Sequence, residues 1–319
     1  MDERGKIATL ARMLGSSSSP TAGIEVGIGD DAAVLATSHA PAHLVWTIDE
    51  QVEGVHFRRT LASWHQVGWR SFMAAASDVA AMGAVPWCAL SALVLSDDVD
   101  DEAFAEIVRG QGDAATAIAA PIVGGNLARG GAVSIATTLL GMCNRPVRRS
   151  GARAGNGLWL AGRLGLAAAG LKAIERSLAG TAALDTAAAA WRTPMALVRE
   201  GSEMAAAASA AVDVSDGFAR DAGHLAEASE VALVFDESAL LADLVLIEAA
   251  EALGESALDL ALYGGEDYAI VATSDVPLAG FRRIGDVCEG QGLRLRGANG
   301  VRAIEPRGFD HFAQRPARA

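Results

Sequence analysis

Apolar and polar positions along the chain predict helices and strands in mixed order. Apolar residues spaced three to four positions apart predict helices at 3–15, 64–82, 101–118, 164–179, 184–191 and 194–210. Short apolar or alternating runs predict strands at 23–35 (two strands around a glycine-acid turn), 44–48, 87–95, 121–123, 132–142, 157–161, 231–235 and 268–273. Segment 211–229 predicts a strand, a turn and a helix. This order favours an α+β or α/β fold without strict βαβ alternation.

One uncharged run tests whether the chain crosses a membrane. Val79 to Ser96 carries no charge, but it contains Gly83 and Pro86. The end of a helix, a glycine-proline turn and a buried strand explain this run better than a transmembrane helix does. We therefore expect no membrane span.

Chain length and one composition shift predict two domains. The chain has 319 residues, more than most single domains contain. Proline, glycine and arginine cluster between the predicted strands at 144–156. We therefore predict an N-terminal domain at 1–146 and a C-terminal domain at 147–319.

The charge balance restricts both partners and chemistry. Asp and Glu number 39 against 26 Lys and Arg, which gives a net charge of −13 and argues against nucleic acid or an anionic membrane as a partner. Only Lys6 and Lys172 are lysines, and neither stands in a P-loop or in a protein-kinase motif. If the protein handles phosphate, then arginines, backbone N–H groups or bound cations must neutralise it.

The cysteines and the N-terminal residues point to the cytoplasm. Cys88, Cys143 and Cys288 lie far apart and form no CxxC pair, which is typical of reduced thiols in a cytosolic protein. The first residues, Met-Asp-Glu-Arg-Gly-Lys, contain no apolar signal-peptide core. We therefore expect a cytoplasmic protein.

Carboxylates stand beside glycines at the ends of several predicted strands. They occur with glycines in the segments 27–31, 213–217 and 264–267, and without a glycine in the segment 47–49. Any one such segment is explained by an ordinary turn or helix cap. Four of them on one chain favour a ligand site, since glycines let the backbone approach a ligand closely.

Asp78 is the most informative single residue. It lies in the otherwise apolar helical run Phe72–Met82, and burial of an unpaired carboxylate costs several kcal/mol. Either an arginine or a hard cation such as Mg²⁺ must compensate its charge, and no His/Cys spacing suggests zinc. Together with the glycine turns, Asp78 suggests a nucleotide-phosphate site built on Mg²⁺.

Two further segments are candidates for contact with anions. Gly124-Gly125-Asn126, with Arg129-Gly130-Gly131, reads as a second glycine-rich loop that either approaches phosphates or only makes a tight connection. Arg148 and Arg149 either contact an anion or are solvated surface arginines.

An ordered set of these motifs carries a resemblance to a known family. Gly27-Ile28-Gly29-Asp30-Asp31, Val52-Glu53-Gly54-Val55-His56-Phe57 and Ser77-Asp78-Val79-Ala80-Ala81-Met82-Gly83 are followed by Arg149-Ser150-Gly151, Asp213-Val214-Ser215-Asp216-Gly217 and Gly264-Gly265-Glu266-Asp267-Tyr268. From about Gly27 to Phe312, the chain resembles the thiamine-monophosphate kinases of the aminoimidazole ribonucleotide (AIR) synthase-like superfamily.

The resemblance implies a fold and a reaction. It implies a two-domain α+β fold of the AIR synthase-like type, in which an N-terminal mixed sheet forms a barrel across a homodimer and a C-terminal α/β sandwich follows. It also implies ATP-dependent phosphorylation of thiamine monophosphate to thiamine diphosphate by direct in-line transfer, with several Mg²⁺ ions and no phosphoenzyme.

The resemblance also assigns roles to residues. The catalytic residues would be Asp78, Asp213 and Asp216. The metal ligands would be Asp31, Thr47, the Ile48 backbone, Asp49, Asp78, Asn126, Asp213 and Asp216. Gly125, Asn126, Arg149 and Ser215 would face ATP. His56, Glu266 and Phe309 would line the thiamine site.

One departure from the family pattern keeps alternatives open. The chain has Gly124-Gly125-Asn126-Leu127-Ala128-Arg129-Gly130 where we expect Gly-Gly-Asp-Thr-Thr-Arg-Gly, so Asn126 keeps an oxygen ligand but loses its charge. The alternatives are a catalytically silent paralogue that binds nucleotide or thiamine phosphates and another ATP-dependent AIR synthase-like enzyme. Selenophosphate synthetase, the hydrogenase-maturation relative and AIR synthase carry terminal signatures that are not found here.

Overall fold

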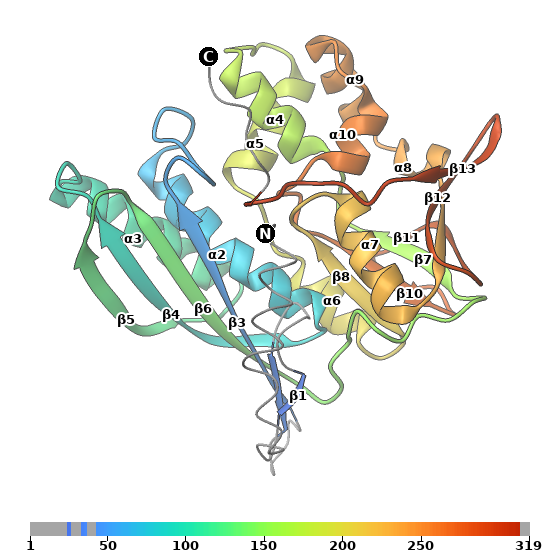
Figure 1. Ribbon diagram of the computed structural model, residues 1–319. Coiled ribbons are helices and arrows are strands. Elements are labelled where there is room, and N and C mark those ends of the chain that lie inside the picture. Colours follow the sequence, from blue (N-terminus) through green and yellow to red (C-terminus); the bar gives the residue numbers. More distant parts are fainter. Residues whose placement is uncertain (1–23, 27–32, 37–42, 313–319) are drawn as a thin grey trace.

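The computed structural model describes residues 24–26, 33–36 and 43–312. Two sheets lie side by side, each with helices packed against it (Figure 1). The first sheet belongs to the N-terminal half of the chain and the second to the C-terminal half.

The first sheet has six strands. They are β1 (Ile24–Val26), β2 (Ala33–Ala36), β3 (His43–Val52), β4 (Val85–Leu95), β5 (Ile122–Arg129) and β6 (Ser134–Cys143). Their order is β1-β2-β3-β6-β4-β5, and all neighbours are antiparallel except β4 and β5. The strand β5 therefore lies at an open edge.

Two helices, α2 (Trp64–Ala81) and α3 (Asp101–Ala117), cover one face of this sheet (Figure 1). Ser63 and Gln66 form a capping box that starts α2, because each side chain satisfies a backbone N–H group of the other residue. From Val67 to Ala81 almost every residue of α2 is buried. The apolar run in the sequence is thus a core helix, in which Asp78 is half-buried.

The second sheet has seven strands and is covered by the remaining helices. Its strands are β7 (Gly157–Ala161), β8 (Ala210–Val214), β9 (Ala232–Asp236), β10 (Ala269–Ser274), β11 (Arg282–Cys288), β12 (Gly292–Gly297) and β13 (Gly300–Ile304). The helices are α4 (Leu166–Glu175), α5 (Ala182–Arg192), α6 (Val198–Met204), α7 (Phe218–Ser229), α8 (Glu237–Leu240), α9 (Leu244–Leu253) and α10 (Ala257–Tyr263). The strand order is β13-β12-β9-β11-β7-β10-β8, which is antiparallel except between β9 and β12.

Helix α2 joins the two halves. Its Phe72 and Val79 belong to the core beneath the first sheet. Its Ala80 instead packs with Met204, Ala211 and Ile270 of the C-terminal half. One helix therefore touches both halves and can carry side chains to the boundary between them.

The structure confirms most of the predicted elements and corrects three regions. The predicted strand 121–123 is the start of β5, which runs on to Arg129, so the expected glycine loop is a strand. A Cβ atom on Gly125 would lie 1.7 Å from the Ser91 carbonyl oxygen, so the pairing of β5 with β4 itself needs glycine there. The helix predicted at 194–210 is shorter in the structure, where α6 covers only Val198–Met204. The strands β11–β13 were not predicted.

The AIR synthase-like α+β class is consistent with these two sheets, but the domain limits 1–146 and 147–319 stay a prediction. The last strand of the first sheet ends at Cys143, and the first strand of the second begins at Gly157. Segment 79–96 is the end of α2 followed by β4, and no described helix is long and apolar enough to cross a bilayer.

Candidate active site

Carboxylates from both halves meet at the end of α2. The Ser77 hydroxyl donates a hydrogen bond to Asp213 Oδ2 at 2.8 Å, and the Thr47 hydroxyl donates to Asp78 Oδ2 at 2.6 Å. Thr47 comes from β3 and Asp213 from β8. Ser77, which binds Asp213, and Asp78 are neighbours on one helix. The helix therefore brings an acid of the first half close to an acid of the second half.

The pKa values of these carboxyls show the cost of that arrangement. Burial, followed by the charge of Asp213, raises the pKa of Asp78 well above its usual range. Burial also raises the pKa of Asp213, against the hydrogen bond from Ser77 and the charge of Arg149. Burial raises the pKa of Asp49 on β3 to about 6, and the charges of Asp213 and Glu266 add to this effect. The cluster has more negative charge than its surroundings compensate.

This donor set fits Mg²⁺. It offers carboxylate and hydroxyl oxygens, which are the ligands of hard cations, and a cation would offset the burial, and at Asp78 and Asp49 also the repulsion, that disfavours the charged carboxylates. Among the residues that the structure describes, no three His, Cys, Asp or Glu side chains lie close enough to form a complete metal cage. That also suits Mg²⁺, which is usually held by one or two carboxylates, waters and substrate phosphates.

The turn after β8 is held by a buried aspartate that the sequence analysis missed. Asp221 Oδ2 accepts hydrogen bonds from the backbone N–H groups of Ser215, Asp216 and Gly217 at 3.0, 3.0 and 3.1 Å. Asp221 lies in the first turn of α7, where an acidic residue is favoured by the helix dipole. Its position four residues after Gly217 is the signal that could have identified it.

Glu266 lies against a buried arginine of the other half. Arg70 on α2 donates hydrogen bonds to the Glu266 carboxylate and to the Trp191 carbonyl oxygen. The indole N–H of Trp191 donates to Glu266 Oε2 at 2.6 Å. Nothing in the sequence pattern linked Arg70 or Trp191 to the site, since the three residues are distant along the chain.

Two of the residues predicted to line the thiamine site, His56 and Phe309, belong to a group of aromatic rings. His311 lies between His56 and Phe309, with ring centroids at 4.9 and 4.8 Å, tilted against His56 and edge-to-face with Phe309. The Val52 N–H donates to His56 Nδ1 at 2.9 Å, so the proton of the neutral imidazole is on Nε2. Burial and the nearby His311 lower the pKa of His56 to about 4, which keeps the ring neutral at neutral pH. His311 is a further site residue that the sequence analysis did not single out.

Comparisons with known proteins give the family of this chain. The family described as AIR synthase related protein, N-terminal domain, matches residues 29–143. The thiamine-monophosphate kinase of Aquifex aeolicus is 31% identical over 290 residues, covering 89% of this chain and 92% of that protein. The Escherichia coli enzyme of the same name is 30% identical, with coverage of 97% and 98%.

A solved structure described as AaThiL complexed with AMPPCP and TMP has a TM-score of 0.88 at 30% identity, covering 98% of this chain and 97% of that chain. The chain belongs to the thiamine-monophosphate kinase family. Membership confirms the resemblance drawn from the motifs, whereas the roles of single residues stay predictions.

The residues predicted to face ATP divide between two places. Arg149 acts on the buried acids, since its charge lowers the pKa of Asp213. Gly125 lies elsewhere: strand register places Asp49, Thr137, Ser91 and Gly125 in one cross-strand row. Three strand spacings separate the ends of this row, or about 14 Å along the sheet.

The remaining residues that were predicted to bind a metal ion or ATP lie in different parts of the structure. Asn126 follows Gly125 on β5 and so lies apart from the buried acids within one chain. Ile48 is 68% exposed, and only its backbone can be a ligand because its side chain has no donor atom. Asp216 lies 3.6 Å from Arg220 Nε, and Ser215 belongs to the turn that Asp221 holds. Asp31 lies outside the described residues.

Proposed function

We propose that this protein transfers the γ-phosphoryl group of ATP to the phosphate of thiamine monophosphate, giving thiamine diphosphate and ADP. The observation that carries the proposal is the charge interaction among Asp49, Asp78 and Asp213, which come from both halves of the chain, in a member of this kinase family. Among the described residues Lys172 is the only lysine, and it binds Glu255 Oε1 at 3.3 Å. We therefore assign the neutralisation of phosphate charge to carboxylate-bound cations and arginines.

The reaction exchanges one phosphorus–oxygen bond for another. A phosphate oxygen of thiamine monophosphate forms a bond to the γ-phosphorus while the bond from that phosphorus to the β–γ bridging oxygen breaks, and ADP leaves with the electron pair. The protein contributes position and charge, because this transfer needs little covalent chemistry from side chains. Arg149 is well placed to orient the phosphates, since its charge already acts on Asp213 and Asp221.

The buried carboxylates are proposed to bind Mg²⁺. Asp49, Asp78 and Asp213, with the Thr47 hydroxyl, are the described residues that would hold the ions; Asp31, Asp216 and the Ile48 backbone are further proposed ligands. When bound, Mg²⁺ neutralises phosphate charge and lowers the barrier to transfer. The same side chains repel the substrates when no cation is present, which predicts strict metal dependence.

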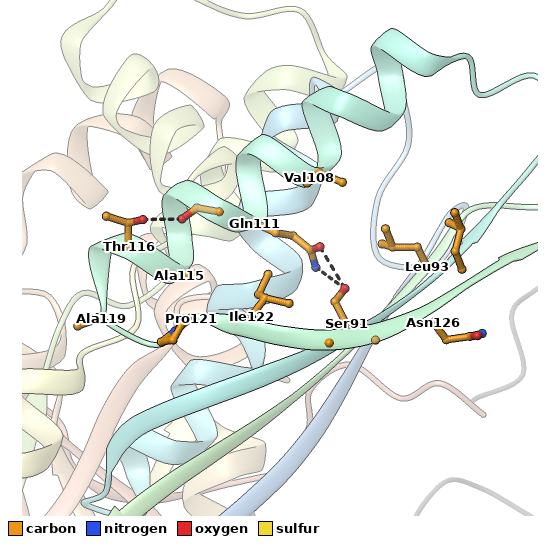
Figure 2. Close-up of a pocket in the computed structure, with 14 residues that line it drawn as sticks. Ser91, Leu93, Val108, Gln111, Ala115, Thr116, Ala119, Pro121, Ile122 and Asn126 are labelled. Carbon is orange, nitrogen blue, oxygen red and sulfur yellow. Dashed lines mark hydrogen bonds between the residues drawn. The ribbon is translucent and has the colours of Figure 1, made fainter.

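A cavity beside β5 is proposed to take the adenosine part of ATP. It has a volume of about 880 Å³ and lies between α3 and the strands β4 and β5, and Figure 2 shows Gln111 and Asn126 among its lining residues. That volume is in the range of small-molecule sites. We expect Val108→Trp, a change on the exposed side of the cavity, to raise the KM for ATP at least about tenfold and to leave the KM for thiamine monophosphate unchanged.

The acceptor is proposed to lie against His56, Glu266 and Phe309. The face of Phe309 offers a stacking surface for a heterocyclic ring. The neutral His56 donates from Nε2, and the Glu266 carboxylate accepts hydrogen bonds. These three groups suit a cationic heterocycle that carries an amino group, which describes thiamine.

A homodimer in the cytoplasm completes the proposal. Ile48 on β3, Thr138 on β6 and Leu90 on β4 form one cross-strand row on the face of the first sheet opposite α2 and α3. Trp46 and Trp87 are exposed on the same sheet. An exposed apolar face of this kind is typical of an interaction surface. We propose that a second copy of the chain packs on it, so that the two sheets together form a barrel.

The deciding experiment incubates the purified protein with ATP, Mg²⁺ and thiamine monophosphate and measures thiamine diphosphate by chromatography. We expect product only when the metal is present. Binding of both ligands without product would instead identify a silent paralogue. Failure to bind thiamine monophosphate, with ATP binding retained, would point to another acceptor within the superfamily.

Asn126 tests whether the departure from the family pattern weakens the enzyme. Because Asn126 is exposed on an edge strand, about 14 Å along the sheet from Asp49, we expect Asn126→Asp to change kcat/KM by less than about tenfold. A much larger gain would show that the asparagine has impaired a working enzyme.

A further inference from the structure

Arg70 is a fully buried cation that reaches from one half of the molecule into the other. Its side chain is 1% exposed, and its guanidinium donates to both the Glu266 carboxylate and the Trp191 carbonyl oxygen. The guanidinium carbon also lies 4.4 Å from the centre of the Trp191 ring. A buried guanidinium needs such partners, because an unpaired charge in the interior is very costly.

Both oxygens of the Glu266 carboxylate are held from the inside. Oε1 accepts from Arg70, and Oε2 accepts from the Trp191 indole N–H at 2.6 Å. The backbone is held as well, since the Glu266 N–H donates to the Ser215 carbonyl oxygen at 2.7 Å. Glu266 has a φ of 63°, an unfavourable value for glutamate that persists only where the surroundings enforce it.

The outer side of this carboxylate stays available. The Glu266 side chain is 27% exposed although its partner Arg70 is almost fully buried. An ionised carboxylate has about four acceptor positions, and the two described donors occupy only part of them. The charge of Glu266 also acts on Asp49, so Glu266 lies near the acid cluster.

We propose that Arg70 and Trp191 are positioning residues that fix the Glu266 carboxylate so that its open side accepts a hydrogen bond from an N–H group of the phosphate-acceptor substrate. This inference rests on the proposed function and extends it, because neither residue touches the substrate itself. The ligand class is a cationic heterocycle with an amino group, because the ionised Glu266 carboxylate, held in one orientation, accepts a hydrogen bond best from such a group.

A purely structural role predicts something different. Trp69 donates from its indole N–H to the Pro194 carbonyl oxygen at 2.6 Å, and Arg192 Nε donates to the Leu61 carbonyl oxygen at 3.2 Å. These bonds join the same two regions without involving Glu266. The halves thus have independent contacts, and Trp69 supplies a matched control for Trp191.

The test compares Trp191→Phe with Trp69→Phe in steady-state kinetics on the full chain. Each change removes one indole N–H at the same contact region, but only Trp191 holds Glu266. We expect Trp191→Phe to raise the KM for thiamine monophosphate about tenfold or more, with the KM for ATP within about twofold of wild type. Trp69→Phe should leave both KM values within about twofold. Equal rises in both KM values, or the same result for both variants, would overturn the inference.

Arg70→Lys provides a second variant in case Trp191→Phe does not fold. Lysine keeps the charge but cannot span the Trp191 carbonyl and the carboxylate as a planar fork does. We expect the same selective rise in the KM for thiamine monophosphate. A wild-type protein that forms no thiamine diphosphate would overturn the proposed function and this inference together. An active wild type with an unchanged acceptor KM in the variants would overturn this inference alone.

Discussion

At the scale of single residues, the acid cluster lowers the stability of the metal-free protein, and we relate this cost to the proposed cation site. Asp78, Asp49 and Asp213 are each held where burial disfavours their charged form. Such perturbed groups gather where proteins bind ions or perform chemistry. The sequence identified Asp78 because a lone carboxylate interrupts an apolar helix. It could not identify Arg70 or Trp191, because they become neighbours of Glu266 only through tertiary folding.

The first prediction concerns Asp78→Asn. The amide keeps the shape of the side chain and can still meet the Thr47 hydroxyl, while it removes a charge that burial and Asp213 oppose. We expect a metal-free thermal midpoint equal to or above that of wild type, together with loss of turnover. Calorimetry with and without Mg²⁺ measures the first effect and the coupled kinase assay the second. A variant with wild-type activity would contradict the role of Asp78.

The second prediction concerns pH. The pKa of Asp49 rises from 3.8 to about 6 on folding, so the folded state binds more protons than the unfolded state between these values. The contribution of Asp49 to the free energy of unfolding therefore falls as pH rises from about 4 to about 6 and is constant above. Without divalent cations, Asp49→Asn should become more stable than wild type over this window, by up to about 3 kcal/mol. Urea titrations in EDTA at pH 4, 5, 6 and 7 check this, and a difference that does not vary with pH would contradict it.

At the scale of elements, the site depends on how turns are joined to helices. The pattern of the sequence predicted α2 and the strand-turn-helix β8–α7 with nearly correct limits, since the apolar periodicity is clear in both segments. It misread Gly124–Asn126 as a loop, because glycine in a strand is explained by the close approach of a neighbouring backbone that the sequence does not show.

The third prediction tests the anchor of the β8–α7 turn. Asp221→Ala removes the acceptor of three backbone N–H groups, so we expect the free energy of unfolding to fall by at least about 2 kcal/mol. We also expect kcat to fall in the folded protein, since Asp216 loses its support. Asp221→Asn keeps an acceptor oxygen and serves as the control, with a smaller loss of both. Equal effects of the two variants would show that the three hydrogen bonds do not position the turn.

At the scale of the whole molecule, the exposed face of the first sheet is the surface on which the proposed dimer depends. Alternation along β3 buries Val45 and Thr47 and exposes Trp46 and Ile48, although both faces of the strand carry apolar residues. A strand that is apolar on both faces indicates cover on both sides. The sequence could not show this, because its pattern does not distinguish a helix of the same chain from a second subunit.

The fourth prediction concerns that face. Leu90 is 42% exposed in the cross-strand row with Ile48, and Leu90→Asp places a charge in the proposed interface. We expect sedimentation equilibrium to give a dimer for wild type and a monomer for this variant. Leu244→Asp is the matched control, since Leu244 is 70% exposed on α9 in the other half. A dimer in both variants would place the interface elsewhere.

The return of the chain to His56 through Phe309 and His311 has a consequence for the timing of biosynthesis. Asp78 of α2 leaves the ribosome early, whereas the ring that contacts His56 belongs to residue 311. At usual translation rates, the 233 residues from Asp78 to His311 take on the order of 10 to 50 s to synthesise. During that interval a nascent chain carries its acid-bearing helix without the aromatic wall of the acceptor pocket. Activity should therefore appear only after essentially the whole described chain has been made, and a chain that ends before residue 309 should form no thiamine diphosphate.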